Sequence, residues 1–325
     1  MKTLVSAHNC IFGSRFLGVY ASTMREWPSL QQKYQCYFVV DDVVGLVTQP
    51  VDTLTFADKA MVAAGQFVAA GVDPRKASIV LTSELPELFE IAFLLSRTVD
   101  VDEVAKRHLN TFAAHLPTAQ RRKLGLAANA SVAEVSYPYL GISAYALALG
   151  ADFWQGGSEV AANHQYMTEL AELFNREVKR SVFKSPKLLL SKLAQFPAAD
   201  GTPMTYANRL SIDASEDEVR RHVDAIRDAN VFAMWLEVAS LTAAARAVRR
   251  SGVFGDKERD VLMSGLVSVL TPFREPRVTN RQVLRALSRG TKAAREQMQD
   301  TLRSMRAALG FSSYLSRFGV KQSRR

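Results

Sequence analysis

The sequence contains few of the residues that mark secreted, metal-binding or membrane-spanning proteins. Its 325 residues include only two cysteines, Cys10 and Cys36, too few for a disulfide framework or a cysteine zinc site. No apolar run approaches the ~20 residues that a membrane-spanning helix needs. The first residues, Met1 to Leu4, lack the apolar core of a secretory signal. We therefore expect a cytoplasmic protein with no membrane segment and no metal site.

Positive charge is concentrated towards the C-terminus. The chain carries a formal net charge of +9, and residues 246–325 contain 18 Lys and Arg against 6 Asp and Glu. The preceding three quarters of the chain are slightly acidic. A basic segment on a near-neutral body indicates an anionic partner, for which nucleic acid is the first candidate. The alternative is an arginine-rich helical surface that faces only solvent.

The N-terminal half alternates short apolar runs with amphipathic segments. The apolar runs typical of strands are at residues 4–7, 37–40, 77–81 and 152–154. The segments with helical spacing are at residues 54–70, 86–95, 137–149 and 160–180. This alternation predicts an α/β fold, with a Rossmann-type parallel sheet joined by helical crossovers.

Beyond residue 180 the pattern changes to helices alone. The segments with helical spacing there are at residues 216–229, 231–250, 256–270 and 280–309. We therefore predict two domains. A Rossmann-type domain that binds a nucleotide or aminoacyl group occupies residues 1–180, and a basic C-terminal all-helical domain occupies residues 181–325.

The first predicted strand is followed by a stretch bounded by Gly13 and Gly18. A strand, a glycine turn and a helix can bring backbone N–H groups and a helix N-terminus against a phosphate. A tight turn that binds no ligand has the same sequence pattern. Within the turn, Arg15 is a candidate bidentate phosphate donor. His8 and Cys10 are a candidate ligand or catalytic pair, with a plain loop as the alternative.

Six further stretches, taken together and in order, resemble those of the class I tryptophanyl-tRNA synthetases over nearly the whole chain. They are WPSLQQKYQCYF at 27–38, GVDPRKA at 71–77, SELPE at 83–87, YPYL at 137–140, PFRE at 272–275 and GTKAAR at 290–295. The resemblance implies a Rossmann-type domain with a helical anticodon-binding-like domain. It also implies a homodimer, and tRNA or aminoacyl-tRNA as the partner.

The same comparison indicates that the family's HIGH and KMSKS signatures are degraded here. In the first, Gly13, Gly18 and Tyr20 hold their places, but Phe16 stands where the family has a histidine that contacts ATP. Val19 likewise replaces an asparagine. Phenylalanine cannot donate a hydrogen bond to a phosphate or ribose. Loss of such a donor at a developing charge typically costs about 2.7–4 kcal/mol.

The second signature is a lysine-rich loop that should follow Asp200 and Gly201. Met204 is kept, but every lysine of the signature is absent, and Tyr206 takes the place of one of them. That lysine would supply positive charge to the pyrophosphate, and a phenol is neutral near pH 7.

The amino-acid pocket that the resemblance implies is also partly changed. Tyr137 and Asp42 keep the places of the family's tyrosine and second-strand aspartate. The Gly-x-Asp-Gln motif keeps Gly157 and lengthens its acid to Glu159, but it loses the amide. Ala144 replaces the aspartate that accepts the indole N–H of tryptophan. A buried acceptor of this kind confers most of a pocket's specificity, so the contact that selects tryptophan is missing.

These losses favour a synthetase-like paralogue that binds tRNA, or uses aminoacyl-tRNA as an acyl donor, and no longer activates tryptophan with ATP. Arg15, His8 and Tyr206 are its candidate catalytic residues. The residues expected to bind tRNA are Arg246, Arg249, Arg250, Arg281, Arg285, Arg289, Lys292 and Arg295. Two alternatives remain, an active ligase with altered amino-acid specificity and a non-catalytic regulatory paralogue. ATP and magnesium are expected only for the ligase.

Overall fold

The protein is described by a computed structural model over residues 1–10, 13–48, 53–108, 130–191, 193–205, 207–275 and 278–311. Among the helices of these ranges, none combines the length and the hydropathy that crossing a membrane would require. The same ranges contain no cluster of His, Cys, Asp or Glu side chains suited to a metal ion.

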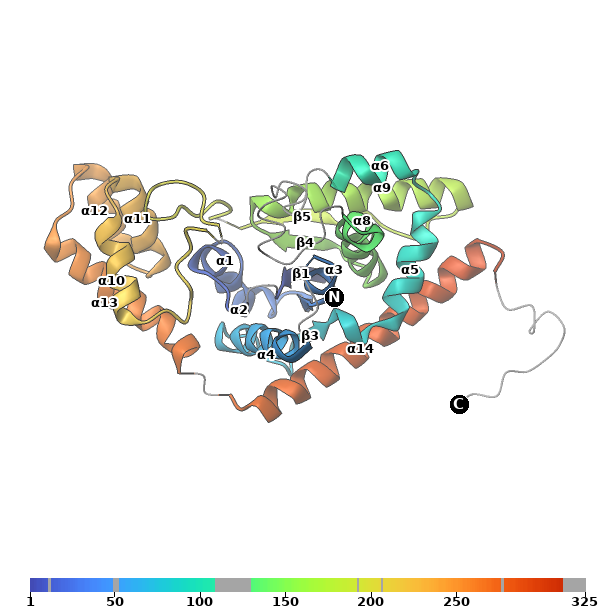
Figure 1. Ribbon diagram of the computed structural model, residues 1–325, viewed down its shortest axis with the longest axis horizontal. Helices are drawn as coiled ribbons and strands as arrows, with labels where there is room; N and C mark the ends of the chain where they lie inside the picture. Colours follow the sequence, from blue (N-terminus) through green and yellow to red (C-terminus); the bar gives the residue numbers. More distant parts are fainter. Residues whose placement is uncertain are drawn as a thin grey trace.

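A five-stranded parallel sheet with the strand order β3-β2-β1-β4-β5 forms the centre of the molecule (Figure 1). The strands are β1 (Thr3–Asn9), β2 (Gln35–Asp41), β3 (Ser78–Leu81), β4 (Phe153–Gly156) and β5 (Lys187–Leu190). The chain winds outward from β1 to β3 and then returns to β4 on the other side of β1. This arrangement confirms the predicted fold class and the predicted strands. The half-exposed edge strand β5 was not predicted.

Both faces of the sheet are buried because its central strands are apolar at nearly every position. Along β2, Phe38 and Val40 face one hydrophobic core, while Tyr37 and Val39 face the other. The first face is covered by α1 (Leu17–Ser22), α2 (Trp27–Leu30) and α4 (Thr53–Ala69), and the second by α5 (Pro86–Ser96), α8 (Val132–Ala148) and α9 (Ala161–Val178). Two shorter helices, α3 (Val43–Thr48) and α6 (Val101–His108), pack against α8.

Four helices form a lobe beside the sheet, at the left of Figure 1. They are α10 (Glu216–Ala225), α11 (Ala229–Val238), α12 (Thr242–Ser251) and α13 (Asp256–Arg274). The hydroxyl of Ser215 accepts the Glu218 N–H at 3.3 Å, and this N-cap fixes the start of α10. The single helix predicted over 231–250 is wrong, because the chain turns at Ser240, where φ is 63°, and separates α11 from α12.

The last helix, α14 (Asn280–Ala308), leaves this lobe and runs along the edge of the sheet beside β3 (Figure 1). The Leu81 N–H donates to Thr291 Oγ1 at 3.1 Å, so α14 satisfies a backbone donor of the edge strand. The predicted boundary after residue 180 therefore assigns β5 and α14 to the helical portion, whereas both pack with the sheet.

Candidate functional site

The carboxyl ends of β1, β2 and β4 meet where the winding of the sheet reverses. Open parallel sheets bind their ligands in the crevice at this point. Three features lie at these strand ends: the turn after β1, the acids Asp41 and Asp42 at the end of β2, and the turn at Gly157 after β4. The topology thus places the predicted pocket residues among these features together at the carboxyl end of the sheet.

The turn after β1 is held against a segment nearly two hundred residues away. Gly13 has a φ of 69°, a left-handed conformation that favours glycine. The Leu17 N–H donates to the Leu210 carbonyl at 2.8 Å, and the Ile212 N–H donates to the Arg15 carbonyl at 3.0 Å. The fold therefore brings together the two segments that resemble the family's signatures.

Three of the predicted pocket residues touch where these segments meet. The Gly18 N–H donates to Met204 Sδ at 3.2 Å. A Cβ added to Gly18 would lie 3.0 Å from the Phe16 ring and 3.3 Å from Met204 Cβ. Phe16 is 9% exposed and Met204 8%, and both belong to the first hydrophobic core. The contact between the two segments is thus apolar at the position where the resemblance implies a histidine that contacts ATP.

Arg15 is almost completely buried beside this contact. Its Nη2 donates to the Gly13 carbonyl at 2.8 Å, and its Nη1 donates to the Asn9 carbonyl. Its backbone N–H donates to Gln66 Oε1 at 2.8 Å. The guanidinium therefore stabilises the loop that follows β1, and a contact with phosphate stays a prediction.

His8 and Cys10 are both buried. The His8 ring contacts Trp27 and Phe67, with ring centroids 5.4 and 6.0 Å away. Burial, together with the charge of Arg15, lowers the His8 pKa to about 3, so the imidazole is neutral at pH 7. Burial raises the Cys10 pKa to about 12 and keeps the thiol protonated. This geometry favours packing roles for both residues.

The burial of the thiols has a direct test. Cys36 is 1% exposed, and burial raises its pKa to about 12 as well. Because the thiolate is the reactive form, we expect iodoacetamide at pH 8 to label neither cysteine in the folded protein and both in urea. Mass spectrometry of the labelled peptides measures this. Rapid labelling of Cys10 in the folded state would instead support the ligand-or-catalytic pair.

A buried carboxylate with several hydroxyl partners lies at the end of β2. Asp41 Oδ1 accepts the Tyr137 hydroxyl at 2.9 Å, the Thr82 hydroxyl at 3.1 Å and the Val44 N–H at 3.1 Å. Its Oδ2 accepts the Tyr145 hydroxyl at 3.3 Å. Burial raises the Asp41 pKa to about 6, although three of these hydrogen bonds oppose that rise.

Asp42 joins the same cluster through Thr82. Its Oδ1 lies 2.8 Å from the Thr82 hydroxyl and 2.9 Å from the Ser83 N–H. The cluster therefore connects Tyr137 and Asp42, two predicted pocket residues, through Asp41 and Thr82, which were not predicted. Two adjacent acids at the end of a buried strand were the available sequence signal for Asp41. Nothing local marked Thr82 or Tyr145 as their partners.

The remaining predicted pocket residues have different surroundings. Ala144 is completely buried in the second core, next to Tyr145. The Tyr20 ring meets Phe273 of α13, with centroids 5.5 Å apart, so it packs against the helical lobe. Gly157 precedes the short 3-10 helix η4 (Ser158–Val160). Tyr206 and the Glu159 side chain lie outside the described residues.

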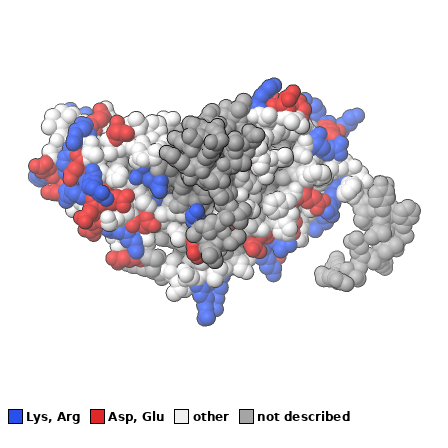
Figure 2. Space-filling view, in the orientation of Figure 1, with Lys and Arg blue, Asp and Glu red and all other residues white. Residues whose placement is uncertain are grey.

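The eight predicted tRNA-binding residues lie on two separate elements. Arg246, Arg249 and Arg250 are on α12 in the lobe, and the other five are on α14. Arg249 forms an ion pair with Glu237, and Arg295 forms one with Glu87 at 3.1 Å. In the view of Figure 2, cations and acids are interspersed over the lobe.

The model of the family described as tRNA synthetases class I (W and Y) matches residues 13–233. The chain belongs to this family. It is 25% identical to the tryptophan–tRNA ligase of Treponema pallidum (strain Nichols), over 93% of this chain and 95% of that protein. It is 26% identical to the tryptophan–tRNA ligase of Thermotoga maritima, over 65% and 62% of the two chains. These findings confirm the resemblance.

The fold is shared with solved structures. The tryptophanyl-tRNA synthetase of Mycoplasma pneumoniae superposes with a TM-score of 0.83 and 16% identity, over 95% of this chain and 98% of that one. The enzyme of Campylobacter jejuni, solved with ADP and tryptophan, gives a TM-score of 0.77 and 17% identity, over 95% and 99%. At this identity the likeness concerns the fold alone, and it confirms the sheet with its C-terminal helical region.

Proposed function

We propose that this member of the family binds tRNA, or uses aminoacyl-tRNA as an acyl donor, and does not activate tryptophan with ATP. The observation that carries the proposal is that Phe16 and Met204, both in the first hydrophobic core, lie against Gly18. Activation requires donors aimed at the charge that develops on the phosphates. An aminoacyl-tRNA is already activated, so a reaction that uses it needs no ATP site.

A second candidate is an ATP-dependent ligase with altered amino-acid specificity. The named relatives are tryptophan–tRNA ligases, and taken alone they favour this candidate over the first. The acid and hydroxyl groups of Asp41, Tyr137 and Tyr145 also provide a polar cluster beside Ala144. Under this candidate, ATP and magnesium are the cofactors, and the turn after β1 has to hold the nucleotide without the family's histidine.

Amino-acid-dependent exchange between ATP and pyrophosphate separates the two candidates. We expect no exchange above the blank with any standard amino acid, with or without bulk tRNA. The related Thermotoga maritima ligase serves as the positive control with tryptophan. Since loss of one such donor costs a factor of about 10²–10³ in rate, the assay needs that dynamic range. Exchange with any amino acid would replace the first candidate by the second.

A Phe16→His, Val19→Asn variant restores the histidine and asparagine of the first signature. Exchange that appears only in this variant would support the assignment of Phe16 to the nucleotide site. The proposal also includes a homodimer, which the family resemblance implies, and a cytoplasmic location, which the composition of the sequence favours. If the protein binds tRNA, we expect its affinity for tRNA to fall steeply as the salt concentration rises, because contacts with phosphates release counterions.

A further inference from the structure

The solvent face of the first half of α14 carries a line of cations. Their spacing of four, four and three residues places them on one side of the helix, about 6 Å apart along its axis for each four residues. They are Arg281, Arg285, Arg289 and Lys292, all exposed. Within the described part of the chain, no ion pair involves any of them, whereas Arg295 and Arg306 on the same helix pair with Glu87 and Glu90. We call these four residues the α14 cation row.

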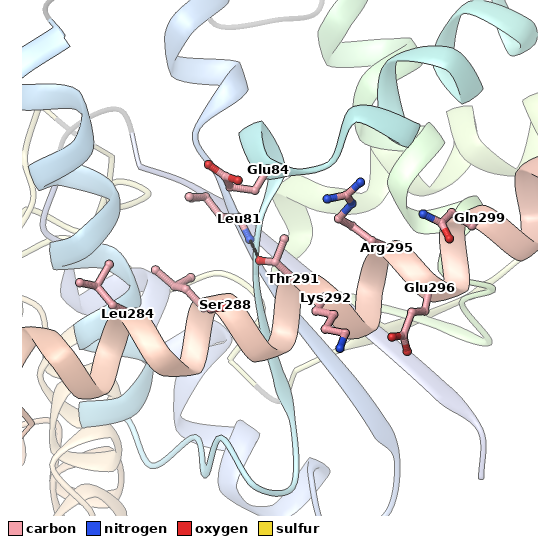
Figure 3. A pocket seen from close by; sticks show the side chains of 10 residues that line it. Leu81, Glu84, Leu284, Ser288, Thr291, Lys292, Arg295, Glu296 and Gln299 are labelled. Atoms are coloured by element: carbon pink, nitrogen blue, oxygen red, sulfur yellow. Dashed lines mark hydrogen bonds between the residues drawn. The ribbon is translucent and has the colours of Figure 1, made fainter. Parts of the chain in front are cut away.

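A groove of about 660 Å³ lies beside the α14 cation row, between α14 and the carboxyl end of β3. Leu284, Ser288 and Lys292 follow one another along its α14 side (Figure 3). Leu81 and Glu84 belong to its opposite side, at the end of β3. Its volume is within the range of sites for small ligands, about 300–1,000 Å³. Lys292 belongs to both the groove and the row, so the two features are continuous.

The charges of the groove limit what can occupy it. Glu84 and Glu296 line it together with Lys292 and Arg295, so its charges balance and it does not attract a ligand whose whole surface is anionic. A nucleic acid strand separates its charge from its bases, because each phosphate is anionic and each base is neutral. Single-stranded segments present unstacked bases that protein pockets bind, while basic side chains follow the backbone. The α14 cation row suits the anionic phosphates of such a strand, and the adjoining groove suits one of its neutral bases.

We propose that α14 binds a single-stranded segment of RNA, with phosphates on the α14 cation row and a base in the adjoining groove at Ser288. The inference rests on the proposed function, in which tRNA or aminoacyl-tRNA is the partner. It goes further by assigning the contact to α14 beside the sheet instead of α12 in the helical lobe, and by including a base pocket.

The cation row is tested by fluorescence anisotropy with a fluorescein-labelled uridine 12-mer and with bulk tRNA as competitor, between 50 and 200 mM KCl. An Arg285→Gln, Arg289→Gln variant should weaken binding at 100 mM KCl by on the order of tenfold. It should also reduce the salt slope by about 1.4, since each single-strand phosphate contact contributes about 0.7. The matched control, Arg303→Gln on the same helix, should leave both unchanged, because Arg303 pairs with Asp300. Circular dichroism melts confirm that the variants fold.

The groove is tested separately by Ser288→Phe, which fills it without a change in charge. We expect weaker RNA binding at an unchanged salt slope. Ser304 is also exposed on α14 but is not among the groove residues, so Ser304→Phe is the control and should bind as the wild type does.

The possible failures are distinguishable. If the wild type binds tRNA but the double arginine variant behaves like Arg303→Gln, the α14 inference is overturned and the proposed function stands. If the wild type binds neither the 12-mer nor tRNA at 50 mM KCl, both are overturned. Equal competition by polyglutamate or by phosphatidylserine vesicles, at matched charge, would show a general anion-binding surface and overturn the assignment to RNA.

Discussion

Replacement of Gly290 by alanine is expected to lower the free energy of unfolding by about 2 kcal/mol, which is the upper end of the usual overpacking cost less the gain in helix propensity. A Cβ on Gly290 would lie 2.2 Å from the Ile79 carbonyl oxygen and 2.6 Å from the Ile79 nitrogen. These are backbone atoms of β3, and Ile79 is paired with Phe38 of β2, so they cannot yield alone. Alanine favours a helix over glycine by about 1 kcal/mol, but overpacking of this kind costs about 1–3 kcal/mol and occasionally more.

Urea denaturation and thermal melting measure the change in stability. Hydrogen exchange at the Leu81 amide gives a local measurement, because this N–H donates to Thr291, the residue that follows Gly290. If α14 is pushed away from β3, that amide should exchange faster in the alanine variant. Stability equal to the wild type, with the Leu81 amide still protected, would show that α14 does not approach β3 this closely.

Gly65 provides the matched control. It lies inside α4, and among the described residues a Cβ there would meet Val283 Cγ2 of α14 alone, at 4.0 Å, an ordinary contact distance. Gly65→Ala should therefore stabilise the protein by about 0.5–1 kcal/mol through helix propensity. Opposite signs for the same substitution in two buried or half-buried helices would separate close packing from propensity.

The position of Gly290 shows what the sequence pattern could and could not predict about α14. The GTKAAR stretch at 290–295 was predicted to belong to a basic tRNA-binding helix. Its helical character is confirmed, but Gly290 and Thr291 face the sheet, and Arg295 pairs with Glu87. A single-sequence pattern reports local spacing, and it does not report which distant strand a helix approaches. Within this stretch Lys292 is exposed, and Arg295 is half-exposed but held in its ion pair with Glu87.

Local patterns were sufficient where one feature dominated. The uninterrupted apolar run of β2 predicted a strand with both faces buried, and the structure confirms it. The separation of α11 from α12 at Ser240 could not be predicted, because no glycine or proline marks it. At the site, the two signature segments meet where Gly18 donates a hydrogen bond to Met204, and these residues are 186 positions apart along the chain. Such contacts have no local signal.

The contacts of the Asp41 cluster likewise join residues that are far apart in the sequence. Its acid is visible in the sequence, but its partners Tyr137 and Tyr145 are 96 and 104 residues away. Burial of a carboxylate among hydroxyl donors is a property of the assembled fold. This burial makes the free energy of unfolding depend on pH, because the pKa of Asp41 in the folded state is higher than that of an exposed aspartate.

The contribution of Asp41 to the free energy of unfolding should fall as the pH rises from 4 to 7. Its pKa is about 6 in the folded protein and about 3.9 in an unfolded chain. Between these values the folded state holds a proton that the unfolded state has released, so raising the pH favours unfolding. The difference of about 2 pKa units corresponds to about 2–3 kcal/mol at full effect. The contribution is complete below pH 4 and lost above pH 6.

The Asp41→Asn variant removes this titration. Relative to the wild type, its free energy of unfolding should therefore increase by about 2–3 kcal/mol between pH 4 and pH 7, whatever its absolute value. Urea denaturation at four pH values measures the difference. Asp73 is the control, because its hydrogen bonds with Arg75 lower its pKa to about 2. The relative stability of Asp73→Asn should change by only a few tenths of a kcal/mol over the same range, since folded Asp73 is ionised throughout and the unfolded residue is already about half ionised at pH 4. A flat difference for Asp41→Asn as well would mean that water reaches the Asp41 carboxylate and that the hydroxyl cluster at the end of β2 is open.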